Sequence, residues 1–240
     1  MTADRLQREL QAAREELSAA AAALAPKHKG GEWERFQEAY ERCLKLEREV
    51  ARAVGDECAV EIEWPVPWNT GAPLPHVLSS GLRTYLIYLV REPDPTWDGS
   101  YAAVVDPAAL MKRPLAVVEF ERCVLYKFGA PNDEVLAGHP LHGKGLAAYR
   151  AHTVERSRWI EEQKRINSVH PQHDPESWKP FRHYLLAFHD ETFECIATAH
   201  SVKEIDSTFA EVLDLCARNF SHSASAAERQ YRWSGNRWTR

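Results

Sequence analysis

The stretch HYLLAFHDETFECIATA, residues 183–199, decides the fold class of this chain. Two runs rich in aromatic and aliphatic residues, 183–189 and 193–199, are separated by Asp190-Glu191-Thr192. Runs of this length and composition favour strands, and a short polar connection between two of them is typical of a β-hairpin. The stretch therefore predicts two antiparallel strands, and with them an antiparallel sheet.

Further β-like segments precede this hairpin, with no helical pattern between them. In residues 58–64, Val60, Ile62 and Trp64 alternate with glutamates, which indicates a half-buried strand. The other segments are LRTYLIYLV (82–90), YAAVV (101–105) and LAVVEFERCVLYKF (115–128), the last with an expected bend near its middle. The proline-rich WPVPWNTGAPLPH (64–76) is expected to be a loop. Such closely spaced strands favour an antiparallel meander.

Two helices are expected to cover one face of this sheet. Ser157 is a suitable N-cap for a helix over 158–166, which offers Trp159, Ile160 and Ile166 to the core. A final helix is expected from the helical spacing of Ile205, Phe209, Val212, Leu213, Cys216 and Phe220. The pattern predicts an α+β domain over residues 56–220.

The first part of the chain, residues 1–55, has the pattern of an antiparallel helical hairpin. Its first helix carries a narrow apolar seam at Leu6, Leu10, Ala13, Leu17, Ala20 and Leu24. Its second helix, 32–54, places Phe36, Tyr40, Cys43, Val50 and Val54 on one stripe. Two alternatives stay open: the hairpin packs on the following domain, or it pairs with a second copy or a protein partner in a four-helix bundle.

The last segment, residues 221–240, loses this periodicity and mixes arginines with aromatic residues. Its members are Arg229, Tyr231, Arg232, Trp233, Arg237, Trp238 and Arg240. Such a mixture can bind single-stranded nucleic acid by stacking and phosphate pairing. The favoured interpretation is instead an extension that packs back or stays loose, because the formal net charge of the whole chain is -5.

Composition excludes several classes of protein. The chain of 240 residues is 44% hydrophobic and 27% charged, which is ordinary for a globular protein. No apolar run is long enough to span a membrane, and the charged start MTADRLQREL does not resemble a secretion signal. We therefore expect a cytoplasmic location. None of the five cysteines forms a CxxC pair, and Cys123, Cys195 and Cys216 are expected in the core.

Histidine is the most informative residue type for function, because it titrates near neutral pH and can shuttle protons or bind ligands. Many of the 11 histidines fall in polar loops or bracket the hairpin strands. The candidate acid–base residues are His139, His170, His189 and Glu194. The candidate ligand-binding residues are Asp133, His142, Lys144, His173, His183 and Asp190. The alternative is structural: histidines beside proline can hold loops by hydrogen bonds, and Asp190 with Thr192 can form the hairpin turn.

No cofactor can be identified from the sequence, and no metal site is assigned. HExxH and paired cysteines are missing, and Pro140 and Pro171 interrupt the two H-x-x-H spacings. A metal site built from His189, Glu194 and one loop histidine stays an alternative. The GKG at 143–145 is not a P-loop, and neither GxGxxG nor GxSxG is present.

The second half of the chain resembles a group of uncharacterised bacterial proteins. The resemblance lies in FGAPNDEVLAGHPLHGKGL (128–146), NSVHPQHDPESW (167–178) and HYLLAFHDETFECIA (183–197). The group shares a PNDE-x-x-x-x-GHPL-x-GKGL loop and an HY-x-x-x-FHD-x-TFE hairpin. The resemblance covers roughly residues 115–200 and implies bacterial origin and a shared fold, but no activity.

The favoured function is a bacterial accessory or binding protein whose histidine-rich loops hold a ligand or partner. The alternative is a small-molecule enzyme that uses histidine and carboxylate acid–base chemistry, with or without a metal. That alternative expects His139, His170, His189 and Glu194 to meet in one pocket. Nucleic-acid binding through the C-terminal segment is the least favoured of the three.

Overall fold

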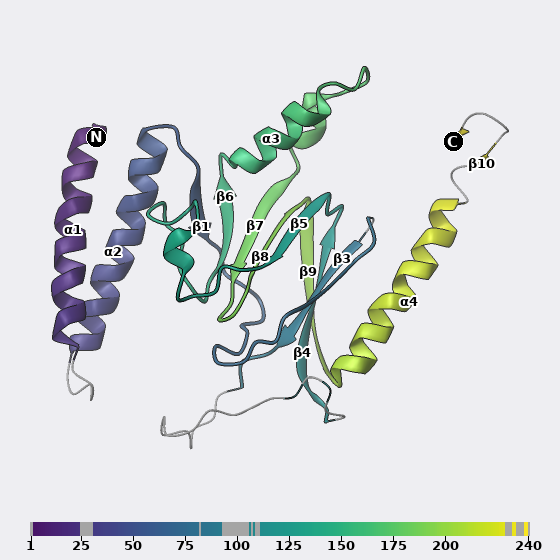
Figure 1. The fold of residues 1–240 in the computed structure, drawn as a ribbon, viewed down its shortest axis with the longest axis horizontal. Coiled ribbons are helices and arrows are strands. Elements are labelled where there is room, and N and C mark those ends of the chain that lie inside the picture. Colours follow the sequence, from purple (N-terminus) through teal and green to yellow (C-terminus); the bar gives the residue numbers. More distant parts are fainter. Residues whose placement is uncertain are drawn as a thin grey trace. The chain divides into compact units, whose positions relative to one another are not determined.

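The computed structural model describes residues 2–24, 31–81, 83–92, 106, 108, 111–228, 232–233 and 238–239 (Figure 1). The chain forms two compact units, one from residues 1–63 and 126–196 and the other from residues 64–125 and 197–240. Both consist of antiparallel strands with helices, so the α+β class is confirmed. The helical hairpin belongs to the first unit.

The first unit begins with the expected helical hairpin, α1 (Ala3–Ala23) and α2 (Glu32–Ala53). Leu6, Leu10 and Ala13 of α1 pack against Cys43 and Leu46 of α2. This is the apolar seam that the sequence predicts, because residues three and four apart lie on one face of a helix. Val54 is not part of it: it follows the last turn of α2 and is exposed.

The hairpin also packs on its own unit through α2, the first of the two alternatives above. Arg150 forms ion pairs with Glu41 of α2 and with Glu61. Arg52 near the end of α2 binds both carboxylate oxygens of Glu155, at 2.8 and 2.9 Å. Charged contacts therefore join α2 to the rest of the first unit.

The first unit contains a five-stranded sheet in the order β1-β6-β7-β8-β5. Its strands are β1 (Cys58–Glu61), β5 (Leu125–Gly129), β6 (Ala151–Glu155), β7 (Arg182–Ala187) and β8 (Thr192–Ala197). The helix α3 (Arg158–Asn167) and the short helices η1 (Leu136–Gly138) and η2 (Pro175–Trp178) lie in its connections. A core cluster on this sheet contains Ala59, Leu136, Leu141, Leu146, Val154, Leu185 and Ala187.

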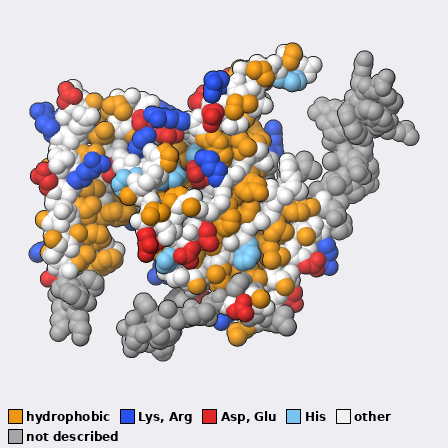
Figure 2. Space-filling model, viewed as in Figure 1, with side chains coloured by type: hydrophobic (Ala, Val, Ile, Leu, Met, Phe, Trp, Pro, Cys, Tyr) orange, Lys and Arg blue, Asp and Glu red, His pale blue; other side chains and the backbone are white. Residues whose placement is uncertain are grey.

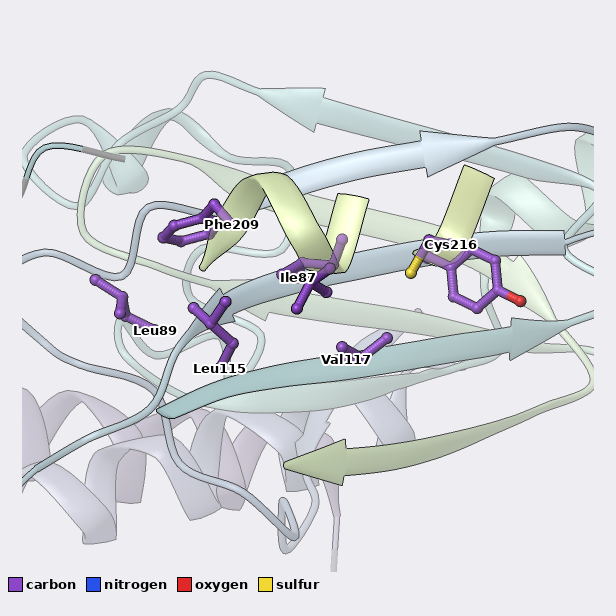
Figure 3. Close-up of a cluster of buried hydrophobic side chains, with 8 residues drawn as sticks. Ile87, Leu89, Leu115, Val117, Phe209 and Cys216 are labelled. Carbon is purple, nitrogen blue, oxygen red and sulfur yellow. The ribbon is translucent and has the colours of Figure 1, made fainter. Parts of the chain in front are cut away.

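The second unit is a four-stranded antiparallel sheet in the order β2-β3-β4-β9, with α4 on one face. Its elements are β2 (His76–Ser79), β3 (Arg83–Leu89), β4 (Arg113–Glu121), β9 (Ala199–Ser207) and α4 (Phe209–Glu228). Figure 3 shows Phe209 and Cys216 of α4 facing Ile87, Leu89, Leu115 and Val117 on β3 and β4. These strand residues alternate along the chain and so share one face of the sheet.

The expected bend in residues 115–128 is present. β4 ends at Glu121 and β5 begins at Leu125, and between them Arg122 has a left-handed backbone with φ 49°. The partner strand breaks at the same level, between β8 and β9, where the Thr198 amide donates to the Glu121 carbonyl. The strands therefore belong to two sheets, and α3 and α4 belong to different units.

Several predicted elements differ in the structure. Ile205 was expected to begin the last helix, but it lies in β9, which pairs with β4, and the helix begins at Phe209. That helix continues to Glu228, into the segment expected to be irregular, which also holds the short strands β10 (Arg232–Trp233) and β11 (Trp238–Thr239). No residue of α3 is buried and Ile166 is 52% exposed, so this helix offers less to the core than expected.

Other predictions concern smaller features. β2 and β6 were not predicted, and the predicted strand 101–105 lies outside the described residues. Cys123, Cys195 and Cys216 are buried, as expected. In the described part of the chain, no helix combines the length and apolar character needed to cross a membrane. Figure 2 shows acidic and basic side chains interspersed over the visible face, with neither sign forming one large patch.

A buried histidine gives the first unit a predicted sensitivity to acid. His152 on β6 is fully buried, and its Nε2 accepts a hydrogen bond from the Ala147 amide at 3.3 Å. Burial, together with the nearby charge of Arg150, lowers the pKa of His152 from 6.5 to about 4. The imidazole is therefore neutral in the folded chain down to about pH 4, whereas in the unfolded chain it takes up a proton below pH 6.5.

We expect this difference to remove roughly 3 kcal/mol of the free energy of unfolding as the pH falls from 6.5 to 4. The substitution His152→Gln keeps a hydrogen-bond acceptor but does not titrate, so it should flatten this part of the pH profile. Urea unfolding at half-unit pH intervals measures the two profiles. Parallel profiles for the wild type and the variant would contradict the assignment.

Candidate functional site

The strands β7 and β8 bring a histidine and a carboxylate of the predicted set together. His183 Nε2 lies 2.8 Å from Glu194 Oε2, and the two side chains are only 4% and 10% exposed. Every residue of β8 is buried, and so are the residues of β7 from His183 onward. The result is a buried hydrogen bond to a carboxylate, which is stronger than one between neutral groups.

A second histidine approaches the other oxygen of the same carboxylate. His139 follows η1, and its Nε2 lies 3.5 Å from Glu194 Oε1. The Leu141 amide donates to His139 Nδ1 at 3.1 Å, which leaves Nε2 as the nitrogen that carries a proton. His139 therefore donates to Glu194, and the local turn around Pro140 sets the orientation of its ring.

Ser157 extends this network away from the carboxylate. Its hydroxyl lies 2.9 Å from His183 Nδ1 and accepts a hydrogen bond from the Ile160 amide at 3.2 Å. The N-cap expected for α3 is thus confirmed, and the same oxygen holds the His183 ring. Trp159, on the first turn of α3, adds an edge-to-face contact with this ring at 5.1 Å between centroids.

Lys127 on β5 completes the group. Its Nζ lies 3.6 Å from Glu194 Oε1 and 4.0 Å from the centre of the Trp159 ring. The side chain is 56% exposed, in contrast to the buried histidines. The ammonium is therefore held between a carboxylate and an aromatic face while it remains open to solvent.

These residues line an open pocket of about 480 Å³ in the first unit. The pocket also contains Glu57, Pro140, Leu141, Arg158, Glu162 and Arg165. Burial raises the pKa of Glu194, but hydrogen bonds from His139 and His183 and the charge of Lys127 outweigh it and hold the pKa well below its usual range. Glu194 is therefore an anion at neutral pH, and its stabilising contribution is lost as the pH falls below its ordinary pKa of 4.5.

A separate cluster forms where the β7–β8 hairpin turns. His189 Nδ1 lies 3.1 Å from Asp190 Oδ1 and 3.7 Å from Asp133 Oδ1. The Tyr149 hydroxyl donates to Asp133 Oδ2, and burial together with this bond and the charges of Asp133 and Asp190 raises the pKa of Tyr149 to about 12. The Asp133 amide donates to the His189 carbonyl at 2.9 Å, so the cluster joins two loops of the first unit.

The expected meeting of His139, His170, His189 and Glu194 in one pocket does not occur. His139 and Glu194 share the pocket with His183, but His189 lies beyond the end of β7, where strand alternation no longer directs its side chain. His170 is exposed in the loop between α3 and η2, and its Nδ1 accepts from the Gln172 amide at 3.1 Å.

The remaining candidates lie outside both groups or have structural contacts. His142 is exposed and His173 is half-buried, and neither lines the pocket. Lys144 forms an ion pair with Asp56, 3.0 Å away, between the end of α2 and β1. This contact occupies the ammonium of a residue that the sequence proposed for ligand binding.

A metal site from His189, Glu194 and a loop histidine is not formed, because His189 and Glu194 belong to different clusters. Within the described residues, no group of three or more histidine, cysteine, aspartate or glutamate side chains has an arrangement suited to a metal ion. The two histidines at Glu194 instead donate directly to its oxygens.

Sequence reasoning did not identify Lys127 and Trp159, which contact Glu194 and His183, as site residues. Lys127 was treated as part of a strand and Trp159 as a core residue, yet both line the pocket. The alternation Tyr126-Lys127-Phe128 was the available signal, because it places a single cation on one face of a strand between two aromatic residues of the opposite face.

The buried histidines of the pocket already have hydrogen-bond partners, whereas several charged side chains of the lining are exposed. Both nitrogens of His139 and both nitrogens of His183 already have hydrogen-bond partners. The pocket is also lined by the exposed side chains of Arg158, Glu162 and Arg165 and by the half-buried Trp159 ring. Comparison of the chain with protein-family models, with curated proteins and with solved structures finds no match in any of the three.

Proposed function

We propose that this chain is a binding protein whose pocket at His139, His183 and Glu194 holds a small organic anion. The observation that carries the proposal is the placement of Lys127. Its side chain is 56% exposed at the pocket, and the nearest carboxylate oxygen lies 3.6 Å from its Nζ, beyond normal hydrogen-bond distance. Within the described residues it makes no hydrogen bond, so its three N–H groups are available to a ligand.

The buried network supports this role by holding Lys127 in place. Glu194 is itself fixed by two histidines, and the Trp159 ring centre lies 4.0 Å from the ammonium. A side chain that is ordered before binding loses less conformational entropy when a ligand arrives. Arg165, exposed on the pocket lining, has no carboxylate within 4.0 Å among the described residues and adds positive charge.

The acid–base enzyme has less support. A general base needs an unoccupied site for a proton, but the nitrogens of His139 and His183 are engaged in other hydrogen bonds. The lowered pKa of Glu194 makes this carboxylate a weak base at neutral pH. The side chains of the two histidines are also only 7% and 4% exposed, which limits their contact with a substrate.

Dimerisation or partner binding through the helical hairpin, expected from the sequence, is a second proposal with less support than ligand binding. Dimerisation through the α1–α2 hairpin would use the outer face of α1, since α2 already contacts the rest of its unit. The cytoplasmic location, the bacterial origin and the resemblance to the uncharacterised group remain predictions from the sequence.

The proposal predicts that a planar carboxylate binds in a manner that depends on the Lys127 charge. Titration calorimetry with benzoate should show binding to the wild type, and Lys127→Gln should weaken it by about tenfold or more, because a charge-assisted hydrogen bond is lost. Benzamide has the same shape without the charge and should bind much more weakly. Lys45→Gln, on the exposed face of α2, is the matched control and should bind benzoate as the wild type does.

Two results would argue against this function. One is benzoate and benzamide binding equally, which would mean that the ammonium does not recognise the ligand. The other is equal benzoate affinity in the Lys127 and Lys45 variants, which would place the binding elsewhere.

A further inference from the structure

A second pocket in the first unit, of about 500 Å³, has a different chemical character. It is lined by the end of β6, the first turns of α3, and the segment around η2. Four basic side chains contribute to it, together with two aromatic rings: Arg156, Lys164, Lys179, Arg182, Trp178 and Phe181. Lys127, His139, His183 and Glu194 do not line it, so it is distinct from the pocket described above.

Main-chain contacts hold the two arginines in place. Arg156 Nη1 donates to the Arg52 carbonyl at 3.0 Å. Arg182 Nη1 donates to the carbonyls of Lys179 and Phe181, at 3.0 and 3.1 Å. Each guanidinium is thus oriented through one nitrogen, which leaves its other N–H groups for a ligand.

The carboxylates of this pocket form their ion pairs with cations other than Arg156 and Arg182. Glu155 accepts hydrogen bonds from Nε and Nη2 of Arg52, and Glu161 forms an ion pair with Lys164 at 2.5 Å. Among the residues that the structure describes, no carboxylate oxygen lies within 4.0 Å of the Arg156 or Arg182 guanidinium nitrogens. Arg156 interacts electrostatically with Glu155, which Arg52 already binds through two hydrogen bonds, whereas Arg182 has no carboxylate of the described residues within this distance.

Two further features favour an anion with an attached ring. Trp178 and Phe181 lie with their ring centroids 5.4 Å apart, so they offer an aromatic wall beside the arginines. Arg156 has a left-handed backbone, with φ 52°. This conformation is uncommon for a residue other than glycine and is often found at ligand sites.

We propose that this pocket is a binding site for a phosphate monoester carried on a planar group. A phosphate offers three terminal oxygens and close to two negative charges, which matches two forked guanidinium donors better than a carboxylate with two oxygens does. The aromatic pair then contacts the planar group.

The test uses the full chain and phenyl phosphate as the probe, with titration calorimetry as the measurement. We expect phenyl phosphate to bind the wild type, and Arg182→Gln and Arg156→Gln each to weaken it about tenfold or more. Arg182→Lys keeps the positive charge but not the forked guanidinium donors. Its affinity for phenyl phosphate should lie between that of the wild type and that of Arg182→Gln. Arg8→Gln, on the exposed surface of α1, is the control and should leave the affinity unchanged.

Two comparisons test the chemistry of the ligand. Inorganic phosphate should bind more weakly than phenyl phosphate, and Trp178→Ala should reduce that difference. Benzoate should respond to Lys127→Gln and phenyl phosphate should not, so failure at one pocket is distinguishable from failure at the other. Absence of phenyl phosphate binding, or binding that ignores both arginine substitutions in variants with native circular dichroism, would overturn the proposal.

Discussion

Glu194→Ala is expected to lower the free energy of unfolding by about 4 kcal/mol, because it removes the acceptor from a buried network. The substitution leaves His183 Nε2 and His139 Nε2, both in side chains under 10% exposed, without the oxygens to which they donate. It also removes the carboxylate nearest to Lys127. Desolvated donors without acceptors cost more than the average hydrogen bond contributes.

Guanidinium chloride unfolding of the wild type and the variant measures this difference. Glu162→Ala is the matched control, since Glu162 lines the same pocket but is exposed, and it should change the free energy by less than about 0.5 kcal/mol. If the Glu194 and Glu162 variants lose equal stability, the hydrogen bonds from His139 and His183 to Glu194 do not stabilise the fold as proposed.

The substitution Gly145→Ala is expected to destabilise the first unit by a comparable amount, about 4 kcal/mol. Gly145 has φ +90°, which is unfavourable for a residue with a side chain. An added Cβ would lie 2.6 Å from the Ala59 carbonyl oxygen and 2.5 Å from Cγ of Arg48. The Ala59 carbonyl belongs to β1 and cannot move without disturbing the sheet, whereas the Arg48 side chain can.

Two other glycines of the same loop region separate the backbone effect from the steric effect. Gly143→Ala meets only the end of the Arg14 side chain, at 3.3 Å, but has φ +73°, so we expect a loss of about 1–2 kcal/mol. Gly138→Ala meets nothing within 4 Å and should be close to neutral. Thermal and denaturant unfolding of the three variants should therefore give a graded series, and equal losses would refute the steric argument at Gly145.

Local periodicity accounts for the parts of the fold that could be predicted. The seam of Leu6, Leu10 and Ala13 depends on residues three and four apart, a pattern that is complete within one helix. The strand 83–89 and the bend after Glu121 follow from composition and alternation in the same local way. Ile205 shows the limit of this method: it fits a helical spacing, but pairing with β4 places it in a strand.

The candidate site could be predicted only as a set of residue types. Histidine and carboxylate side chains in long loops and a hairpin indicated binding or acid–base chemistry, and His139, His183 and Glu194 do share a pocket. The same criteria also selected His189 and Asp133, which form a different cluster, and His170, which is exposed. Spacing along the chain does not distinguish these cases, because the contacts depend on loop paths.

By itself, the sequence determined the α+β class, the helical hairpin, the antiparallel strands and the residue types available for chemistry. Only the tertiary structure decided which of those residues meet. The pairing of β5 with β8 brings Lys127 to Glu194, and the first turn of α3 brings Trp159 over the same ammonium. The physical reason is that helices and strands follow from interactions between near neighbours, whereas a site needs side chains brought together from distant segments by packing of the core.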